Sequence, residues 1–558
     1  MEAIRTDIYV TNVEANRGIA LNCVPFFNAA KKEKEGKSPK PSPKPGKKES
    51  TKKTGKDHST KSSLGNDLPH TSTEKEPNHK TVVVGGFKTE VLGTADERDV
   101  LFQPGRLIVD LIAARDLCDR AKSPYGLASY EHNQILLPVH SGKNPVWAAQ
   151  AVFDIVNSNY QLTIHILEKA ETQNNFLGML HILPSWVPNQ PYENWYNLQG
   201  DGEMEVSGQA HVRVTFKKAD TRKLTVDDFD LLMVIGKGSF GKVLQVKKKD
   251  TNRIYAMKIL KKGHLIERDE LEHTKSERAI LAKNNNCPFL VGLKFSFQTP
   301  EKLYLVLDYI NGGELFFHLQ NEGTFSENRS RFYASQLVLG LKYLHENDII
   351  YRDLKPENIL IDFMGYICLT DFGLCKENIK WDDITNTFCG TPEYMAPEVL
   401  QQKGYGPAVD WWTIGVLLYE MITGLPPFYD ENTNQMYQKI LFADLKFPQG
   451  VSREATSIIK QLLVRNPQNR LGYGATGSQD IVDHEFFAVI NWDDMWNKRL
   501  VAPWRPHLED QLDTKNFDEE FTALPAQDTL VTEAPITNTM QAEFKGFTYS
   551  DTNEYLEN

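Results

Sequence analysis

The chain has 558 residues, which suggests three or four modules at roughly 150 residues per domain. Its 63 Lys+Arg against 74 Asp+Glu give a net charge of −11, and the absence of a basic domain excludes nucleic acid as the main expected partner. The six cysteines form no CxxC pair and no zinc-site spacing, and the sequence shows no signal-peptide core or 18-residue apolar stretch, so we expect a soluble, cytoplasmic protein with reduced thiols.

The N-terminal segment is rich in Lys, Pro and Ser. Residues 31–80 contain 14 lysines against 7 acidic residues, and their only large hydrophobic side chains are Leu64 and Leu68. Such a composition cannot bury enough apolar surface to offset the entropy of ordering the chain. We therefore predict a disordered basic tail over residues 1–95, which serves either as a solvated linker or as a loose electrostatic contact with anionic lipid.

Residues 96–220 have the periodicity of β-strands. Leu107–Val109 is a dense apolar run, and hydrophobic side chains alternate with polar ones over Leu162–Ile166 and Val212–Phe216. Runs with a period of two, separated by Gly, Pro and Asn turns, predict an all-β antiparallel sandwich.

Residues 229–487 begin with short strands and continue with helices. Phe229–Val234, Val243–Val246 and Ile254–Leu260 are predicted strands. A later apolar series from Tyr333 to Leu344 has helical spacing, with Ser326 as its expected N-cap. This order predicts a bilobal α+β module, with a β-rich lobe followed by a helical lobe.

Two motifs in the β-rich lobe suggest a nucleotide site. Ile235–Val243 fits GxGxxGxV, and its glycines let the backbone approach phosphates closely. Tyr255–Lys258 places a lysine in an apolar strand, where its charge is costly unless it is paired. Glu277, in the predicted helix Leu271–Ala282, is the candidate partner, although a lysine at a sheet edge would be the simpler structural reading.

A charged loop follows the long helix. Tyr351–Asn358 leads directly into the apolar strand Ile359–Ile361, and Asp371-Phe-Gly373 comes shortly after. A carboxylate and an amide on neighbouring loops suit a hard cation such as Mg²⁺ that bridges phosphates.

With Ala396-Pro-Glu398 after them, these motifs make residues 229–487 resemble a eukaryotic protein kinase. The resemblance implies an enzyme that uses ATP and Mg²⁺, with these catalytic roles: Asp353 orients the substrate hydroxyl, Lys355 stabilises the γ-phosphoryl, Asn358 and Asp371 hold Mg²⁺, and Lys258 paired with Glu277 positions the α- and β-phosphates. The loop begins with Tyr351 where many kinases have His, and Tyr is typical of the AGC group.

The same resemblance implies an ATP-binding set. It comprises Ile235, Gly236, Lys237, Gly238, Ser239, Phe240, Gly241, Val243, Ala256, Lys258, Leu360 and the hinge from Asp308 to Ile310.

The activation region resembles that of AGC-group serine/threonine kinases. Thr387-Phe-Cys-Gly-Thr-Pro-Glu393 implies a regulatory phosphosite at Thr387, whose phosphate Arg352 could hold, and a contact of Thr391 with Asp353. Acidic positions that read basic residues upstream of the phosphorylated Ser/Thr are implied at Glu314, Glu357 and Glu420.

The acidic tail, residues 488–558, ends in an AGC hydrophobic motif. This motif, Phe544–Tyr549, implies docking of Phe544, Phe547 and Tyr549 beside the Glu277 helix and phosphorylation of Thr548. Asn516–Phe521 resembles the tail segment that passes the nucleotide site. Thr529 is the expected turn-motif phosphosite, with Thr532 as the alternative.

Residues 96–220 resemble a C2 domain in Gly105–Val109, Asn144–Trp147, Phe176–Gly178 and Trp195–Leu198. Many such domains bind Ca²⁺ through Asp clusters, but the loop after Leu167 contains no Asp. We expect the Ca²⁺ site to be lost, which leaves membrane, protein or intramolecular contacts.

The combined order most resembles the fungal Ypk-type kinases, relatives of the serum/glucocorticoid-regulated kinases. The resemblance implies a monomeric enzyme in TOR-type membrane-stress signalling that phosphorylates Ser/Thr in basic contexts. A phosphoinositide-dependent-kinase-like enzyme and the second TOR complex would activate it, and anionic lipid would recruit it to the plasma membrane. Two alternatives remain: a pseudokinase scaffold, and a membrane-recruitment module whose kinase activity is secondary.

Overall fold

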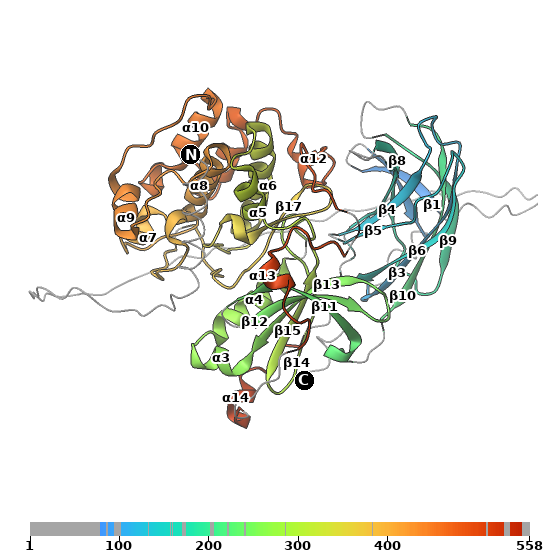
Figure 1. Ribbon diagram of the computed structural model, residues 1–558, viewed down its shortest axis with the longest axis horizontal. Helices are drawn as coiled ribbons and strands as arrows, with labels where there is room; N and C mark the ends of the chain where they lie inside the picture. Colours follow the sequence, from blue (N-terminus) through green and yellow to red (C-terminus); the bar gives the residue numbers. More distant parts are fainter. Residues whose placement is uncertain are drawn as a thin grey trace, which may run out of the picture. The chain divides into compact units, whose positions relative to one another are not determined.

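The computed structural model describes the following residues: 79–84, 87–93, 102–131, 133–156, 158, 160–169, 175–200, 206–219, 223–238, 241–284, 286–381, 383–508, 510, 512–528 and 536–548 (Figure 1).

Two β-sheets form the sandwich module, the name used below for residues 79–219. The first sheet has the order β1-β2-β8-β7-β4-β5 and the second the order β6-β3-β10-β9. Their strands are β1 (His79–Val84), β2 (Phe87–Leu92), β3 (Gly105–Arg115), β4 (Pro124–Tyr130), β5 (Asn133–Leu136), β6 (Val146–Ile155), β7 (Leu162–Glu168), β8 (Asn175–Leu183), β9 (Pro191–Asn197) and β10 (Gln209–Lys218). Side chains from both sheets share one hydrophobic core.

Alternation along the strands explains this packing. In β10, Ala210, Val212, Val214 and Phe216 are buried while the residues between them are partly exposed. Successive side chains on a strand point to opposite faces, so one face of each sheet supplies the core. The predicted all-β sandwich is confirmed.

The sandwich begins earlier in the chain than the sequence analysis predicted. Strands β1 and β2 lie within residues 1–95, which were predicted to be a disordered tail, and β2 pairs in parallel with β8. The buried residues Val91 and Leu92 belong to this segment. The lysine-rich composition of the preceding residues obscured a short stretch of strand-forming sequence.

The strand lobe, residues 223–308, contains an antiparallel five-stranded sheet of order β11-β12-β13-β15-β14. Its elements are η1 (Val226–Asp228), β11 (Phe229–Lys237), β12 (Gly241–Lys248), β13 (Ile254–Lys261), α3 (Lys262–Glu267), α4 (Leu271–Lys283), β14 (Leu293–Gln298) and β15 (Lys302–Asp308). The three strands and the Glu277 helix predicted here are confirmed.

The helical lobe, residues 315–508, is built around α6 (Glu327–Glu346) and α8 (Ala408–Thr423). The Ser326 side chain accepts a hydrogen bond from the Arg329 amide, so the predicted N-cap of α6 is confirmed. Trp411 and Trp412 of α8 are fully buried. Most residues of α8 are buried, as expected for a helix in the interior of a lobe.

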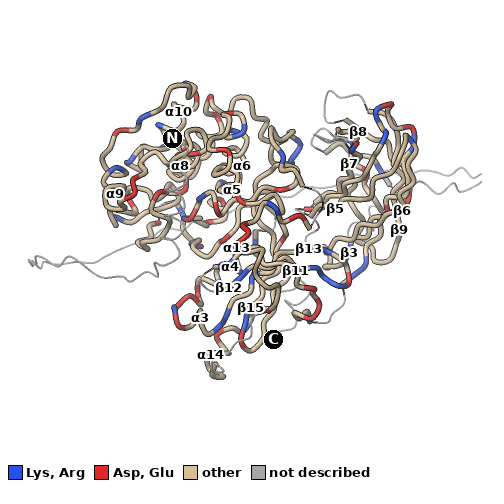
Figure 2. Tube along the Cα trace, in the orientation of Figure 1, with Lys and Arg blue, Asp and Glu red and all other residues tan. Residues whose placement is uncertain are grey.

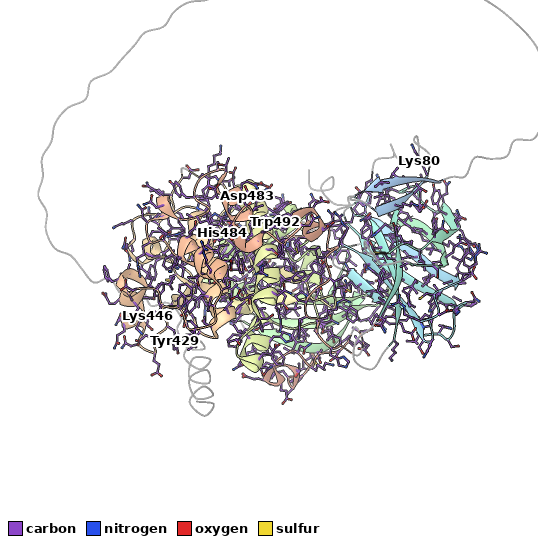
Figure 3. The ribbon with its side chains drawn as sticks, turned by 90° about the horizontal axis from the view of Figure 1, so that it is seen from above. Lys80, Tyr429, Lys446, Asp483, His484 and Trp492 are labelled. Carbon is purple, nitrogen blue, oxygen red and sulfur yellow. The ribbon has the colours of Figure 1, made fainter. Side chains whose placement is uncertain are left out.

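Shorter elements complete the helical lobe and the tail. They are α5 (Leu315–Glu322), η2 (Pro356–Asn358), β16 (Ile359–Ile361), β17 (Ile367–Leu369), η3 (Pro392–Tyr394), α7 (Pro397–Leu400), α9 (Thr433–Phe442), α10 (Arg453–Leu462), η4 (Pro467–Asn469), α11 (Gly477–Val482), η5 (Glu485–Phe487), α12 (Trp492–Trp496), α13 (Glu519–Thr522) and α14 (Asn538–Ala542). His484, labelled in Figure 3, caps η5 by accepting a hydrogen bond from the Phe486 amide.

Charged residues of both signs are interspersed over the backbone of the sandwich module and of both lobes (Figure 2). Among the residues that the structure describes, no helix is long and apolar enough to cross a membrane.

Candidate active site

The glycine-rich loop joins β11 and β12. A Cβ atom added to Gly241 would lie 1.7 Å from the Ile259 carbonyl oxygen on β13, so only glycine fits this close approach of two backbones. At Gly238 the same addition would meet nothing within 4 Å. The predicted ATP-binding residues Ser239 and Phe240 lie outside the described part of the chain.

Strand β13 and helix α4 bring three charged groups together. The Lys258 Nζ atom lies 2.6 Å from Glu277 Oε1 and 3.6 Å from Asp371 Oδ1. Glu277 is buried, so its carboxylate depends on this ammonium for its charge balance. Lys258 is thus paired, and the simpler reading of a lone lysine at a sheet edge does not apply.

The pKa values around Lys258 follow from this arrangement. Burial disfavours the ammonium, but Asp371 and Glu277 outweigh burial and raise the pKa of Lys258. The Lys258 charge also lowers the pKa of Asp371 against the effect of burial. An ionised Asp371 and a protonated Lys258 therefore coexist at neutral pH.

The catalytic loop surrounds Asp353 with hydrogen-bond donors. Asn358 Nδ2 donates to Asp353 Oδ2 at 3.0 Å, and the Thr391 hydroxyl donates to Oδ1 at 3.0 Å. Lys355 Nζ lies 3.0 Å from Asp353 Oδ2 and 3.3 Å from Thr391 Oγ1. The structure brings these four predicted residues into one hydrogen-bonded group, which fixes the direction of the Asp353 carboxylate.

A buried aspartate on α8 anchors the start of the catalytic loop. Asp410 accepts hydrogen bonds from the amides of Tyr351 at 3.0 Å and Arg352 at 2.9 Å, and His345 Nε2 lies 2.7 Å from its Oδ2 atom. Arg352 has a φ of 71°, a conformation that costs free energy for a side chain of its size. The hydrogen bonds to Asp410 maintain this strained backbone.

Asp371 and Asn358 have donor atoms that suit Mg²⁺. Asn358 commits its Nδ2 group to the carboxylate and carbonyl of Asp353, which leaves its Oδ1 atom as an acceptor. The Thr370 amide, next to Asp371, donates to the Asn358 carbonyl at 2.9 Å. An amide oxygen and an ionised carboxylate on adjoined loops fit a hard cation that keeps its remaining ligands from water and phosphate.

The hinge between the lobes differs from the expectation at one side chain. Ala256 and Ile310 are buried near the predicted adenine site, and Leu360 is partly buried. The Asp308 side chain is also buried, but it forms its contacts with Lys294 and Asn133. Only its backbone is therefore a candidate for contact with adenine.

Four glutamates, called the acidic group below, form the candidate substrate-reading surface: Glu314, Glu357, Glu393 and Glu420. Burial, with the charges of Glu357 and Asp518, raises the pKa of Glu314 to about 7. Burial, partly offset by a 2.6 Å hydrogen bond from the Tyr394 hydroxyl, raises the pKa of Glu420 to about 8. Glu393 was not predicted to belong to this group, because in the sequence it is simply the last residue of the activation motif. Its position two residues after Thr391 was the only signal in the sequence that could have placed it near the substrate.

The activation segment exposes Thr387. The Tyr405 hydroxyl donates to the Thr387 carbonyl at 2.7 Å, and Arg352 Nη1 donates to the Tyr405 hydroxyl at 3.3 Å. Arg352 therefore lies one side chain away from Thr387, within reach of a rearrangement that would bring its guanidinium to a phosphate.

The tail returns to the strand lobe. Phe544 and Phe547 are buried, and their carbonyl oxygens accept hydrogen bonds from Gln298 Nε2 at 2.9 Å and from the Ser296 hydroxyl at 2.6 Å. Glu543 of the tail lies 3.7 Å from Lys275 of α4, so the tail contacts the predicted helix. Thr548 is described, whereas Tyr549, Thr529 and Thr532 lie outside the described residues.

The Asn516–Phe521 segment lies against the hinge. The rings of Phe517 and Tyr309 stack at 6.0 Å, and the Tyr309 hydroxyl donates to the Asp513 carbonyl at 3.3 Å. Asp528, next to Thr529, pairs with Lys302 Nζ at 2.5 Å.

Comparison with known proteins finds three family matches. Residues 229–487 match the protein kinase domain, residues 508–549 the protein kinase C terminal domain, and residues 105–198 the C2 domain.

The chain is also similar to several fungal kinases. It is 48% identical over 436 residues to serine/threonine-protein kinase gad8 of Schizosaccharomyces pombe, covering 76% of this chain and 75% of gad8. It is 46% identical over 472 residues to serine/threonine protein kinase ypkA of Aspergillus fumigatus, covering 76% and 72%. It is 53% identical over 342 residues to serine/threonine-protein kinase YPK1 of Saccharomyces cerevisiae, covering 61% and 50%.

Proposed function

Because the chain belongs to the AGC-type serine/threonine protein kinases with a C2 domain and is similar to the Ypk/gad8/SGK-like kinases, we propose that it transfers the γ-phosphoryl group of ATP to Ser/Thr hydroxyls that follow basic residues. The observation that carries the proposal is the hydrogen-bonded group of Asp353, Lys355, Asn358 and Thr391 beside the Lys258–Glu277 ion pair.

ATP would bind between the lobes. Val243, Ala256, Leu360 and the hinge backbone would enclose adenine, and Lys258, held by Glu277, would contact the α- and β-phosphates. Asn358 and Asp371 would hold Mg²⁺, which when bound neutralises charge on the phosphates. Protein residues thus supply position and charge, which are the main requirements of phosphoryl transfer.

Asp353 would orient the attacking hydroxyl. One of its oxygens is saturated by Asn358 and Lys355, and the other accepts the Thr391 hydroxyl. A substrate Ser or Thr would present its hydroxyl to this second oxygen, and its proton would pass to the carboxylate. Lys355, already adjacent, would stabilise the negative charge on the transferred group.

The acidic group supports a preference for basic peptides. Several carboxylates close together and partly desolvated are costly without a cation. An arginine upstream of the phosphorylated residue would supply that positive charge, and its guanidinium can donate two parallel hydrogen bonds to one carboxylate. Glu314, Glu357 and Glu420 are the proposed readers, and Thr391 would favour Ser/Thr.

Activation would proceed through phosphorylation. A phosphate on Thr387 would draw Arg352 from Tyr405, and one on Thr548 would stabilise tail docking beside α4. Lys242 and Lys302 contact Gln527 and Asp528, the last described residues before the proposed turn-motif phosphosite Thr529; Thr532 is the alternative site. We propose a phosphoinositide-dependent-kinase-like enzyme and the second TOR complex as the upstream kinases.

A second candidate function is a membrane-recruited scaffold in which the C2 domain is the main element. The matched C2 domain favours contact with anionic membranes, together with the basic N-terminal segment. The intact charged group around Lys258 and Asp353 argues against a pseudokinase, because a scaffold does not require it.

Substitution at Asp371 tests the proposed function. We expect Asp371→Ala to lower the rate of radiolabelled phosphate transfer from ATP to an Arg-x-Arg-x-x-Ser peptide by a factor on the order of a thousand, because the charge that holds Mg²⁺ is lost.

Asp480→Ala, an exposed aspartate on α11, is the matched control and should retain full activity. Normal phosphorylation by the Asp371 variant would contradict the site assignment. An inactive wild-type protein that binds anionic vesicles would favour the scaffold.

A further inference from the structure

A turn of the sandwich module reaches the back of the hinge. Glu131, between β4 and β5, pairs with Lys294 of β14 in the strand lobe. The two side chains are only 4% and 2% exposed. Removal of one partner from a fully buried ion pair between two modules is strongly destabilising, because the remaining charge stays buried without its counter-charge.

The same ammonium contacts the first hinge residue. Lys294 Nζ lies 3.5 Å from Asp308 Oδ1, and Asp308 is 1% exposed. Asn133, at the start of β5, donates from Nδ2 to the same Asp308 oxygen at 2.9 Å. Arg253, just before β13, in turn donates to Oδ1, the side-chain amide oxygen of Asn133. The hinge carboxylate therefore contacts Lys294 of the strand lobe and Asn133 of the sandwich module. Glu131 and Arg253 contact these two residues in turn.

The position of Asp308 depends on these contacts. Its Oδ2 atom is buried and has no hydrogen-bond partner among the described residues, so the carboxylate is held through Oδ1 alone. Burial disfavours the Lys294 ammonium, but Asp308 and Glu131 together raise its pKa. Loss of the Glu131 charge would leave Lys294 to be neutralised by Asp308 only and would shift the ammonium toward the hinge.

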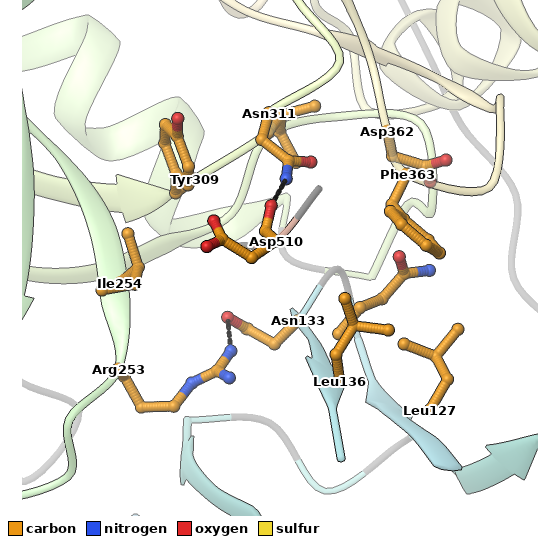
Figure 4. Close-up of a pocket in the computed structure, with 12 residues that line it drawn as sticks. Leu127, Asn133, Leu136, Arg253, Ile254, Tyr309, Asn311, Asp362, Phe363 and Asp510 are labelled. Atoms are coloured by element: carbon orange, nitrogen blue, oxygen red, sulfur yellow. Dashed lines mark hydrogen bonds between the residues drawn. The ribbon is translucent and has the colours of Figure 1, made fainter. Parts of the chain in front are cut away.

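Residues of the sandwich module also lie close to the hinge across a small cavity. A small cavity of about 40 Å³ has Asn133 and Leu136 of the sandwich module on one wall, and on the other Tyr309 of the hinge and Asn311, which follows the hinge (Figure 4). Asn311 also contacts the carbonyl of Asp510 in the tail. The rear of the hinge is thus lined by the sandwich module, while the proposed adenine site lies on its front.

Apolar side chains of the sandwich module also contact the helical lobe. Tyr125, Leu127 and Leu167 of the sandwich module form a small cluster against which Phe363 and Met364 pack. These last residues belong to the turn between β16 and β17, next to the catalytic loop. The sandwich module therefore contacts both lobes on either side of the hinge.

We propose that Glu131 and Asn133 of the sandwich module are positioning residues of the nucleotide site. Through Lys294 and Asp308 they fix the hinge backbone from Asp308 to Ile310, so that ATP affinity depends on the docked C2 domain. This inference rests on the proposed function, because it takes that hinge as the adenine contact. It assigns the sandwich a role in catalysis that is separate from any contact with membranes.

The test measures initial rates of the full chain as the ATP concentration is varied at a saturating concentration of Arg-x-Arg-x-x-Ser peptide. We expect Glu131→Gln and Asn133→Ala to raise KM for ATP on the order of tenfold and to leave kcat and KM for the peptide within about twofold. Calorimetric titration with Mg·ATP should give the same loss of affinity without any transfer step. Glu131→Asp, which keeps a negative charge beside Lys294, should lose less of that affinity than Glu131→Gln.

Glu193→Gln is the matched control, since Glu193 pairs with Arg213 within the sandwich. An unchanged KM for ATP in both Glu131→Gln and Asn133→Ala would overturn the proposal. Equal losses in kcat, peptide KM and ATP KM would also overturn it, since they indicate general destabilisation. If Glu131→Gln fails to fold, Glu131→Asp and Asn133→Ala replace it in the same measurements. If wild-type protein binds Mg·ATP but transfers no phosphate, the proposed function fails while the titration still tests the hinge.

Discussion

Glu420 shows how position changes the chemistry of a residue. It lies on an otherwise apolar helix, where a lone carboxylate would ordinarily be exposed, yet it is 3% exposed. Burial and the neighbouring charges of Glu357 and Glu393 raise its pKa to about 8, against the hydrogen bond from Tyr394. An upstream arginine would favour the ionised form, so substrate binding and ionisation of Glu420 are linked.

This linkage predicts pH-dependent substrate affinity. In the free protein Glu420 is protonated below about pH 8 and ionises as the pH rises through that value. We expect KM for an Arg-containing peptide to fall between pH 6 and 8.5, and Glu420→Gln to remove much of this fall and raise KM on the order of tenfold at pH 8. Initial rates at saturating ATP measure both quantities.

Glu314, with a pKa of about 7, would retain a smaller dependence at lower pH in the Glu420 variant. The control is a peptide whose upstream arginines are replaced by alanine, for which KM should not respond to the variant. A Glu420→Gln protein with wild-type KM for the basic peptide at every pH would rule out Glu420 as a reader.

Sequence reasoning succeeded at the residue scale where a motif is contiguous. Asp353, Lys355 and Asn358 occupy one short loop, so their spacing already predicted that they act together, and the structure brings them within hydrogen-bonding distance. It could not predict the direction of the Asp308 side chain or the inclusion of Glu393 in the acidic group. Both depend on neighbours that are distant in sequence.

For helices and strands, the local sequence pattern predicted the type of an element better than it predicted where the folded module begins. The β11–β13 strands and α6 have clear periodicity and a cap, and both were predicted. Strands β1 and β2 were missed, because they follow a long lysine-rich segment and are stabilised by pairing with β8, about 90 residues later in sequence. Tertiary pairing of this kind leaves little local signal.

The β11–β12 hairpin yields a prediction from two of its three glycines, Gly238 and Gly241. Gly241 leaves no room for a Cβ atom against the Ile259 carbonyl, whereas Gly238 faces open space. We expect Gly241→Ala to cost about 1–3 kcal/mol, which lowers Tm by several degrees and raises KM for ATP. Gly238→Ala should keep the wild-type Tm.

Thermal unfolding followed by circular dichroism, with ATP-dependent kinetics on the same samples, measures both effects. Equal losses of Tm in the two variants would contradict the assignment of the close contact to Gly241, because only one position meets backbone atoms.

At the scale of the whole chain, buried charged residues join the sandwich module to the strand lobe. Asp154 of β6 is 7% exposed and accepts hydrogen bonds from Tyr255 at 2.6 Å and Thr251 at 3.2 Å in the strand lobe. Lys248, 3% exposed, lies 3.2 Å from the same carboxylate. No sequence pattern predicts such a contact, since each partner is an ordinary charged residue in its own module.

These contacts predict that the sandwich module and the strand lobe unfold together. Asp154→Ala leaves the Tyr255 hydroxyl and the Lys248 ammonium buried with fewer partners, a change that costs about 3–5 kcal/mol for a broken buried pair. Asp250, 2.7 Å from Lys248, reduces that cost by retaining one ion pair. We expect calorimetry to show one transition for these parts in the wild type and an earlier, separate sandwich transition in the variant.

Asp110→Ala is the matched control, because Asp110 lies on the adjacent strand β3 and its salt bridge, to Arg213 at 3.9 Å, stays within the sandwich. Asp154→Asn should be intermediate, since its amide oxygen can still accept from Tyr255 while the charge opposite Lys248 is lost. If Asp154→Ala melted as Asp110→Ala does, the buried charges would be incidental to the coupling. Because Asp154→Ala leaves Lys248 with fewer partners only while the modules are docked, an earlier sandwich transition in that variant is the result that distinguishes a coupled interface from an incidental one.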